Sequence, residues 1–398
     1  MLIGMPQAAA AVVHGKDPST VRPAAALPLK LLRPLLLVAV LGTGFLAAVA
    51  LLVGGPAYSS ALPRPPVALP PAPPSGGGKQ PLERWARAPA SAWHNMTDDE
   101  LLWAASWRPS VRRYPYRRTP KVAFMFLTRG PLPLAPLWER FFAGAGGGDA
   151  GLFSVYVHAT PGYRPDFAPA SAFYRRQVPS QVAEWGEPSM FDAERRLLAN
   201  ALLDPGNERF VLLSESCVPL YGFPAVYSYL TRSRESFVGA FDDPGPGGRG
   251  RYQGGLAPEV VREQFRKGAQ WFELERALAV DVVADGRYYP KFREHCRPPC
   301  YADEHYLPTA LSILAPARIA NRSVTWVDWS RGGAHPATFG EADVGEAFLR
   351  RLTAPGKDQG NCTYNGQPAQ VCFLFARKLA PGTLQPLLRL APMLLGYG

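Results

Sequence analysis

From Lys121 to Phe241 the chain alternates short apolar runs with amphipathic segments, and each apolar run ends at a turn or a polar cluster. The runs are rich in Val, Leu and Phe, as buried strands are, whereas the segments between them carry apolar residues at helical spacing. Strands that alternate with helices predict an α/β fold, with a largely parallel sheet and helices on both faces. We expect strands at 121–128, 152–158, 209–213 and 236–241, with helices at 135–143, 191–203 and 223–230 between them.

The pattern is looser outside this region. Thr97 to Glu100 has the capping-box pattern of a helix start. After the aromatic pair Trp271 and Phe272 we expect a helix within 269–285, a strand at 324–329, a helix at 341–352 and a strand at 371–375.

Polar residues follow each of the first four expected strands. In an open α/β sheet the ligand crevice lies at the carboxyl ends of the strands, so these residues mark a candidate pocket. They are Thr128, Arg129, His158, Glu215 and Asp242. Asp242 and Asp243 precede Pro244, which favours a turn over a metal site. His158 could equally be an ordinary strand-end histidine.

The second constraint lies near the N-terminus, where residues 34–55 carry no charged side chain. The run from Leu35 to Val53 is apolar, and at about 1.5 Å per residue it would span roughly 29 Å, close to the thickness of a bilayer core. A cleaved signal peptide is the alternative, but its apolar region is shorter and its basic leader is short as well. We therefore expect an uncleaved membrane anchor.

Charge on either side of the apolar run sets the expected orientation. Lys16, Arg22, Lys30 and Arg33 precede the run, and the next basic residue is Arg64. The positive-inside rule then keeps the N-terminus in the cytosol and carries the rest of the chain across the membrane. We expect a cytosolic tail at 1–33, an anchor at 34–55, a Pro-rich stem at 56–118 and a lumenal domain at 119–398.

A lumenal location gives meaning to two further features. The acceptor triplets at Asn95, Asn321 and Asn361 are candidate glycosylation sites, and disulfides are permitted there. For the five cysteines we favour the local pairs Cys296–Cys300 and Cys362–Cys372, which leaves Cys217 unpaired, although the sequence allows other connectivities.

Composition narrows the classes of function. The formal net charge of +11 favours an anionic partner, and 47% hydrophobic residues are ample for a large core. Basic residues are scattered rather than grouped, so we do not expect a nucleic-acid partner. The sequence has no phosphate-binding GxxxxGK[ST] motif, no G-x-S-x-G motif, and no spacing of His or Cys typical of a metal site.

The densest polar stretch is Cys296 to Thr309, CRPPCYADEHYLPT. It contains the adjacent acids Asp303 and Glu304, which could simply cap a helix. A carboxylate at a helix start is favoured as the anion, and an anion can act as a general base.

This stretch, in the form CYADEHYLPTAL, resembles the S-P-D-E-x-x-x-x-T segment of the core-2/I-branching β-1,6-N-acetylglucosaminyltransferases, glycosyltransferase family 14, especially their plant branch. The resemblance extends over roughly residues 120–395. It is also carried by KVAFMFLTRGPLP, LLSESCVPLY, FVGAFDDPGPGGRGRY, KGAQWFELERALA, VTWVDWS and CTYNGQPAQVCFLFARKL.

The resemblance implies a type II Golgi enzyme with a Rossmann-like, GT-A type fold. Such an enzyme would transfer a sugar from a UDP-sugar to a glycan or glycoprotein, and N-acetylglucosamine is the sugar that the resemblance favours. The reaction would belong to cell-wall or glycoprotein glycan synthesis. It implies inversion without a metal or other cofactor. The general base falls on Glu304, diphosphate binding on Lys378 with Arg377 as a second candidate, and acceptor contacts on Glu215 and Trp271. Without a metal, Arg and Lys must neutralise the departing diphosphate.

Two other classes of function stay open at this point. A membrane-anchored carbohydrate-binding or scaffold protein on a transferase fold would bind glycans without turnover. A glycoside hydrolase would need a second carboxylate opposite Glu304, which Asp242 or Glu215 could supply. Trp271 could likewise be core rather than a sugar contact.

Overall fold

The computed structural model describes residues 88–109, 114, 118–146, 151–333, 335–354 and 362–398. The expected cytosolic tail, membrane anchor and residues 56–87 of the expected stem lie outside the described residues, and so does Asn361. Within the described ranges no helix is both long enough and apolar enough to cross a membrane.

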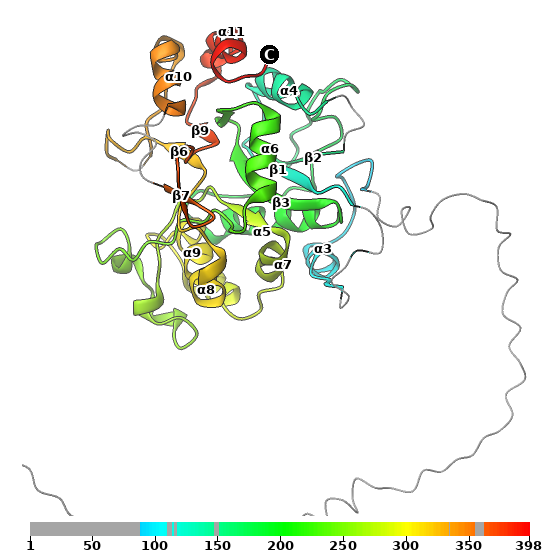
Figure 1. The fold of residues 1–398 in the computed structure, drawn as a ribbon. Helices are drawn as coiled ribbons and strands as arrows, with labels where there is room; N and C mark the ends of the chain where they lie inside the picture. The colour runs from blue at the N-terminus through cyan, green and yellow to red at the C-terminus, as the bar shows by residue number, and fades with distance from the viewer. Residues whose placement is uncertain (1–87, 110–113, 115–117, 147–150, 334, 355–361) are drawn as a thin grey trace, which may run out of the picture. The chain divides into compact units, whose positions relative to one another are not determined.

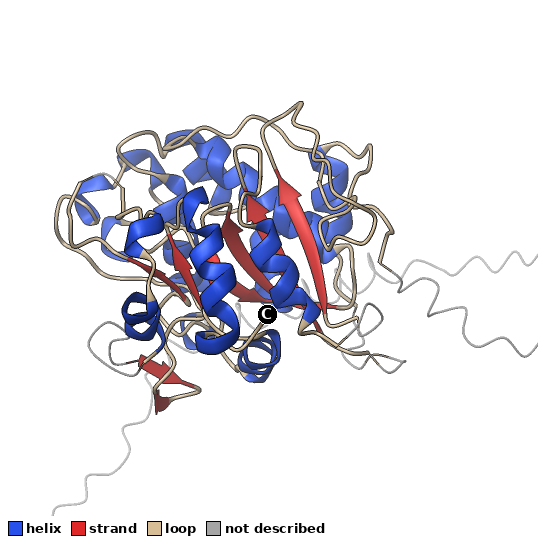
Figure 2. Cartoon of the chain, turned by 90° about the horizontal axis from the view of Figure 1, so that it is seen from above, coloured by secondary structure: helices blue, strands red, loops and turns tan. Residues whose placement is uncertain are grey.

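The central sheet has four strands in the order β2-β1-β3-β5. Strands β1 (Lys121–Leu127), β2 (Phe153–His158) and β3 (Asn207–Ser214) are parallel, and β5 (Glu273–Glu275) runs antiparallel to β3. The prediction of an α/β fold with a largely parallel sheet is confirmed. Figure 2 shows the strands lying between helices.

Side chains of β1 point alternately into two hydrophobic cores, one on each face of the sheet. Ala123 and Met125 pack on the side of α5 (Pro188–Leu202), α7 (Arg276–Val283) and α9 (Ala302–Leu314). Phe124 and Phe126 pack on the side of α4 (Ala135–Ala143) and α6 (Phe223–Arg232). Because both faces are covered, β1 is apolar at every residue from Val122 to Leu127 rather than at every second residue.

The remaining elements extend these two sides. The C-terminal helix α11 (Leu384–Leu394) lies beside α4 (Figure 1). The others are α3 (Asp98–Ala105), α8 (Tyr289–His295), α10 (Glu346–Thr353), the hairpin of β7 (Cys362–Tyr364) and β8 (Gln367–Ala369), and the short 3₁₀ turns η1 (Arg249–Arg251), η2 (Gly254–Leu256), η3 (Arg262–Gln264), η4 (Pro316–Arg318), η5 (Glu341–Asp343) and η6 (Pro381–Thr383).

A second, smaller sheet has the order β4-β9-β6. Its central strand β9 (Phe375–Arg377) runs antiparallel to β4 (Val218–Pro219) and parallel to β6 (Thr325–Val327). The strand expected at 371–375 therefore begins later than predicted and extends to Arg377. This sheet fixes Arg377 and the following residue at the end of a buried strand.

The strand expected at 236–241 was wrong. Ser236, Phe237 and Phe241 each make a single bridge, to Ile319, Glu273 and Lys267 respectively, so the segment has no continuous partner. Near its end the Ala240 N–H donates to the Asn321 side chain, at 2.6 Å, instead of to a neighbouring strand. The edge of the central sheet is occupied by β5, whose pairing partner is 60 to 70 residues away along the chain and leaves no local signal.

The helix expected at 341–352 is divided into η5 and α10, because the backbone of Gly345 is extended between them. The other predicted helices are confirmed with small shifts of their ends, and Thr97 and Glu100 form the predicted capping box of α3.

Both favoured disulfides are present. Cys296–Cys300 closes the loop that precedes α9, with 5.1 Å between the Cα atoms, and Cys362–Cys372 encloses the β7–β8 hairpin. Cys217 is a buried free thiol.

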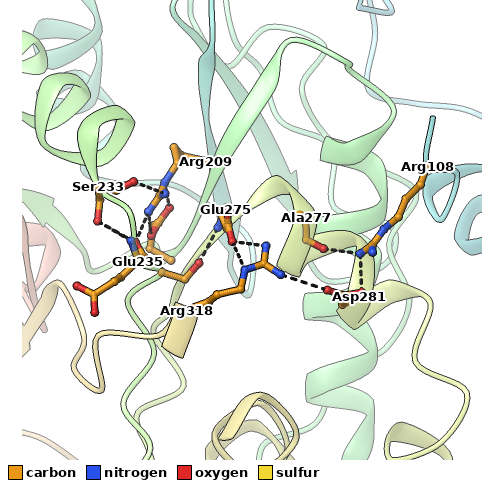
Figure 3. Close-up of polar contacts among 10 residues, drawn as sticks. Arg108, Arg209, Ser233, Glu235, Glu275, Ala277, Asp281 and Arg318 are labelled. Atoms are coloured by element: carbon orange, nitrogen blue, oxygen red, sulfur yellow. Dashed lines mark hydrogen bonds and ion pairs between the residues drawn. The ribbon is translucent and has the colours of Figure 1, made fainter. Parts of the chain in front are cut away.

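A buried ion pair joins β3 to β5. The Arg209 guanidinium donates from Nε and Nη2 to the two oxygens of Glu273, at 2.6 and 2.7 Å. It also donates to the carbonyl oxygens of Ser233 and Glu235, while Arg318 nearby bridges Glu275 and Asp281 (Figure 3). Burial raises the pKa of Glu273, and Arg209 opposes that shift. The pair thereby holds β5, which directly follows Trp271 and Phe272, against the central sheet.

We predict that Glu273→Ala lowers the free energy of unfolding by about 3–5 kcal/mol, because it leaves the Arg209 charge buried without its partner. Urea denaturation followed by circular dichroism measures this change. The matched control is Glu346→Ala, which breaks an exposed pair with Arg350 and should cost at most about 0.5 kcal/mol. Equal costs for the two variants would show that the buried pair does not stabilise the sheet.

Candidate active site

A cavity of about 1050 Å³ opens at the carboxyl ends of β1, β2 and β3. This is the edge of the sheet at which the sequence predicts a crevice, and the volume of the cavity is at the top of the range of small-molecule pockets, about 300–1,000 Å³. Nearly all of the sequence-predicted site residues line it: Thr128, Arg129, His158, Glu215, Trp271, Asp303, Glu304, Arg377 and Lys378. Of the pair Asp242 and Asp243, it is Asp243 that lines the cavity.

Glu304 lies in the first turn of α9, where the helix dipole favours a negative charge. Its Oε2 atom accepts a hydrogen bond from Arg251 Nη1 at 2.8 Å, and Lys267 Nζ lies 3.8 Å from the same oxygen. About a quarter of the side chain, 27%, remains exposed. Two cations and a helix terminus therefore hold an accessible carboxylate at the wall of the cavity.

The backbone beneath Glu304 is fixed by a close approach of two segments. The Gly268 N–H donates to the Glu304 carbonyl oxygen at 2.9 Å. A Cβ atom at Gly268 would come within 2.1 Å of the Gly239 carbonyl oxygen and 2.7 Å of Pro308 Cγ. Residue 268 must therefore be glycine for the segment that carries Lys267 to pack against α9.

Sequence reasoning missed Arg251, which sits on η1 within a glycine-rich loop. The side chains of Asp242 and Asp243, which precede the loop, shape it. Asp243 Oδ1 accepts a hydrogen bond from the Gly245 N–H at 2.8 Å, and Asp242 Oδ2 accepts one from Arg249 Nη2 at 2.8 Å. Both aspartates thus make hydrogen bonds that stabilise this turn, as the sequence predicts. Among the described residues no group of three or more His, Cys, Asp or Glu side chains could hold a metal ion.

A cationic group lies on another part of the cavity wall. The Arg377 guanidinium stacks 3.9 Å above the Trp271 ring, and its Nε atom is buried with no hydrogen-bond partner among the residues described. Burial lowers the pKa of Arg377. Partial burial, and then the charges of Arg377 and Arg129, lower the pKa of Lys378, while Glu215 opposes this. The group is short of negative charge, as an anion-binding site is.

Three predicted residues have structural partners. His158 Nε2 accepts from the Gln181 N–H and contacts Arg196 Nη1, each at 3.3 Å, and burial followed by the Arg196 charge lowers the pKa of His158 to about 4. Thr128 Oγ1 bonds the backbone of Gly130. Trp271 is buried and stacks under Arg377, as a core ring does, but it also lines the cavity, so its acceptor contact stays a prediction.

Asp303 differs sharply from its neighbour Glu304. It is buried, its Oδ1 atom has no hydrogen-bond partner in the described part of the chain, and burial followed by the Glu304 charge raises its pKa to about 7. Glu194 on α5, also missed from sequence, is fully buried beside it, and burial followed by Asp303 raises the pKa of Glu194. Gln270 Nε2 donates to Glu194 at 2.8 Å. Of these acids, Glu304 is the one that two cations hold at the cavity.

Two comparisons with known proteins gave matches. The family model described as "Core-2/I-Branching enzyme" matches residues 122–353. A curated relative, "Glycosyltransferase BC10" from Oryza sativa subsp. japonica, is 39% identical over 303 residues, which cover 65% of this chain and 73% of the relative. The matched region contains Arg251, Lys267 and Glu304.

Asp303 generates a prediction about stability and pH. With its pKa raised to about 7, Asp303 keeps its proton in the folded state up to about pH 7, whereas the unfolded chain releases it near the ordinary pKa of 3.8. The folded state therefore binds more protons between these values, and Asp303 makes the protein progressively less stable as pH rises through that window. Asp303→Asn removes this effect. We predict that raising the pH from 4 to 8 increases the free energy of unfolding of the variant, relative to that of wild type, by at least about 1 kcal/mol. Thermal or urea unfolding at the two pH values measures this change.

The control is Asp99→Asn, at an exposed position on α3. Its stability difference from wild type should stay nearly constant over the same pH range. If Asp303→Asn behaves in the same way, Asp303 does not carry a raised pKa in the folded protein.

Proposed function

The chain belongs to the Core-2/I-branching enzyme family, glycosyltransferase family 14, in its plant branch, and on that premise we propose a metal-independent, inverting transfer of a sugar from UDP. Membership makes it a glycosyltransferase, with a nucleotide-sugar donor and a glycan acceptor. The observation that carries the finer proposal is the position of one accessible carboxylate, Glu304, in a cavity that also contains a cationic group of Arg129, Arg377 and Lys378.

Glu304 is the proposed general base. Its carboxylate takes the proton of an acceptor hydroxyl while the acceptor oxygen bonds to the anomeric carbon of the donor sugar. The bond between that carbon and the diphosphate oxygen breaks at the same time, so UDP leaves and the anomeric configuration inverts. Arg251 and Lys267 both contact Oε2, and we assign Oε1 to the acceptor hydroxyl.

The cationic group is the proposed diphosphate site. Arg377 and Lys378 both line the cavity, where a guanidinium and an ammonium group can donate charge-assisted hydrogen bonds to phosphate oxygens. Neighbouring cations disfavour the charged form of Lys378, and the negative charge of a bound diphosphate would offset this effect. Negative charge that develops on the leaving group is then neutralised by the chain's own side chains, which is the role a divalent ion has in many other transferases.

We further propose N-acetylglucosamine as the sugar, a glycan or glycoprotein as the acceptor, and a lumenal site of action in the Golgi. The support for these points is the family resemblance together with the apolar run at 34–55 and the glycosylation triplets. In the structure Asn95 and Asn321 are both exposed, as acceptors of a glycan must be.

Two variants test the proposed roles. Glu304→Gln should lower the rate of UDP release from a UDP-sugar by about 10²–10⁴-fold, because it removes the base, while the Kd for UDP stays within about twofold. Lys378→Ala should lower the rate and also weaken UDP binding. Rates are measured in the presence of a chelator, and UDP binding by calorimetry.

The matched control is Glu294→Gln, at an exposed position on α8, which should keep the wild-type rate. Full activity of Glu304→Gln would contradict the assignment of the base. Glycan binding without turnover in the wild-type protein, with Lys378→Ala tolerated, would instead support a carbohydrate-binding protein on a transferase fold.

A further inference from the structure

Two tryptophans at the cavity are more exposed than large aromatic side chains usually are. Trp185 is 52% exposed and Trp329 is 49% exposed, and both line the cavity. Large apolar side chains that stay exposed around a groove typically mark a surface that binds a ligand. Neither the proposed base nor the cationic group accounts for Trp185.

Trp185 is held in place by other rings. Its ring centroid lies 5.2 Å from that of Tyr301, with the planes 39° apart, and 5.2 Å from that of His335. The next residue, Gly186, has φ +83°, and a Cβ there would lie 3.0 Å from Tyr301 Cε1. The turn that presents Trp185 therefore packs closely against Tyr301, and the exposed ring is supported rather than loose.

The same aromatic group is linked to Glu304. Tyr301 is the residue just before α9, and the guanidinium carbon of Arg251 lies 4.6 Å from the centre of its ring. Arg251 also donates to Glu304 Oε2. Trp185, Tyr301, Arg251 and Glu304 thus form one connected row of contacts, which leads from the exposed Trp185 ring to the proposed base.

We propose that Trp185, Tyr301 and His335 form a platform on which a pyranose ring of the acceptor stacks, one or more units away from the sugar that carries the attacking hydroxyl. The inference rests on the proposed function and deepens it, because it makes the acceptor an oligosaccharide chain. A pyranose has an apolar C–H face that an aromatic ring can cover, while the polar edges of Trp and His can bond its hydroxyls.

The position of the platform favours the acceptor over the uracil of the donor. Lys378, the proposed diphosphate ligand, has Arg377, Glu215 and Arg129 as its electrostatic neighbours. Trp185 instead connects through Tyr301 and Arg251 to the group that must contact the acceptor hydroxyl. A nucleobase on the platform is therefore treated as an outcome of the test.

The test uses purified full-length protein with Trp185→Ala, Trp185→Phe and a control. Titration with cellotetraose, xylotetraose and N-acetylchitotetraose, each beside its monosaccharide, measures glycan binding, and titration with UDP measures donor binding. We expect at least one tetrasaccharide to bind wild type at least about tenfold more tightly than its monosaccharide. Trp185→Ala should lose that difference, Trp185→Phe should keep most of it, and UDP binding should stay within about twofold.

The control is Trp103→Ala, which removes an even more exposed ring (64%) on α3 and should change neither titration. Weaker UDP binding in Trp185→Ala with glycan binding intact would make the platform a nucleobase site and overturn the proposal. An absence of tetrasaccharide binding to wild type, or wild-type glycan binding in Trp185→Ala, would also overturn it. Failure of the proposed function has a different signature: wild type would release no UDP from sugar nucleotides, whatever the glycan titrations show.

Discussion

The ion pair between Arg251 and Glu304 is the contact on which the rest of the site depends. It joins a glycine-rich loop to the first turn of α9 and places a charged carboxylate at the cavity wall. The loop is shaped by Asp243, and α9 is fixed by Gly268, whose close packing leaves no room for a side chain. The Cys296–Cys300 bridge closes the segment that enters the helix. Each of these features limits where Glu304 can point.

The cavity separates charges in a way that suits transfer between two substrates. One carboxylate accompanied by cations lies at α9, and a cationic group that lacks enough negative partners lies at the end of β9. Asp303, which precedes Glu304, and Glu194, which lies beside Asp303, are both buried, and burial raises the pKa of each. Further negative charge next to Glu304 is thereby disfavoured.

Features with local causes could be predicted from the sequence. The three parallel strands are built around short apolar runs, the disulfides join neighbouring cysteines, and α9 begins at the acids of the polar stretch. Features with distant causes could not. Arg251 lies 53 residues from Glu304, Glu194 lies 76 residues from Gln270, and β5 pairs with β3 across a similar distance. The segment at 236–241 has the composition of a strand, but its neighbours change along its length, and composition does not reveal neighbours.

The most direct measurement of the central claim is the anomeric configuration of the transferred sugar, followed by NMR during the reaction of an α-linked UDP-sugar with an oligosaccharide in the presence of a chelator. If Glu304 is the single base and cationic side chains hold the diphosphate, the product should be β-linked. It should form at the same rate as UDP, and the chelator should not lower that rate. An α-linked product, or a reaction abolished by the chelator, would contradict the account.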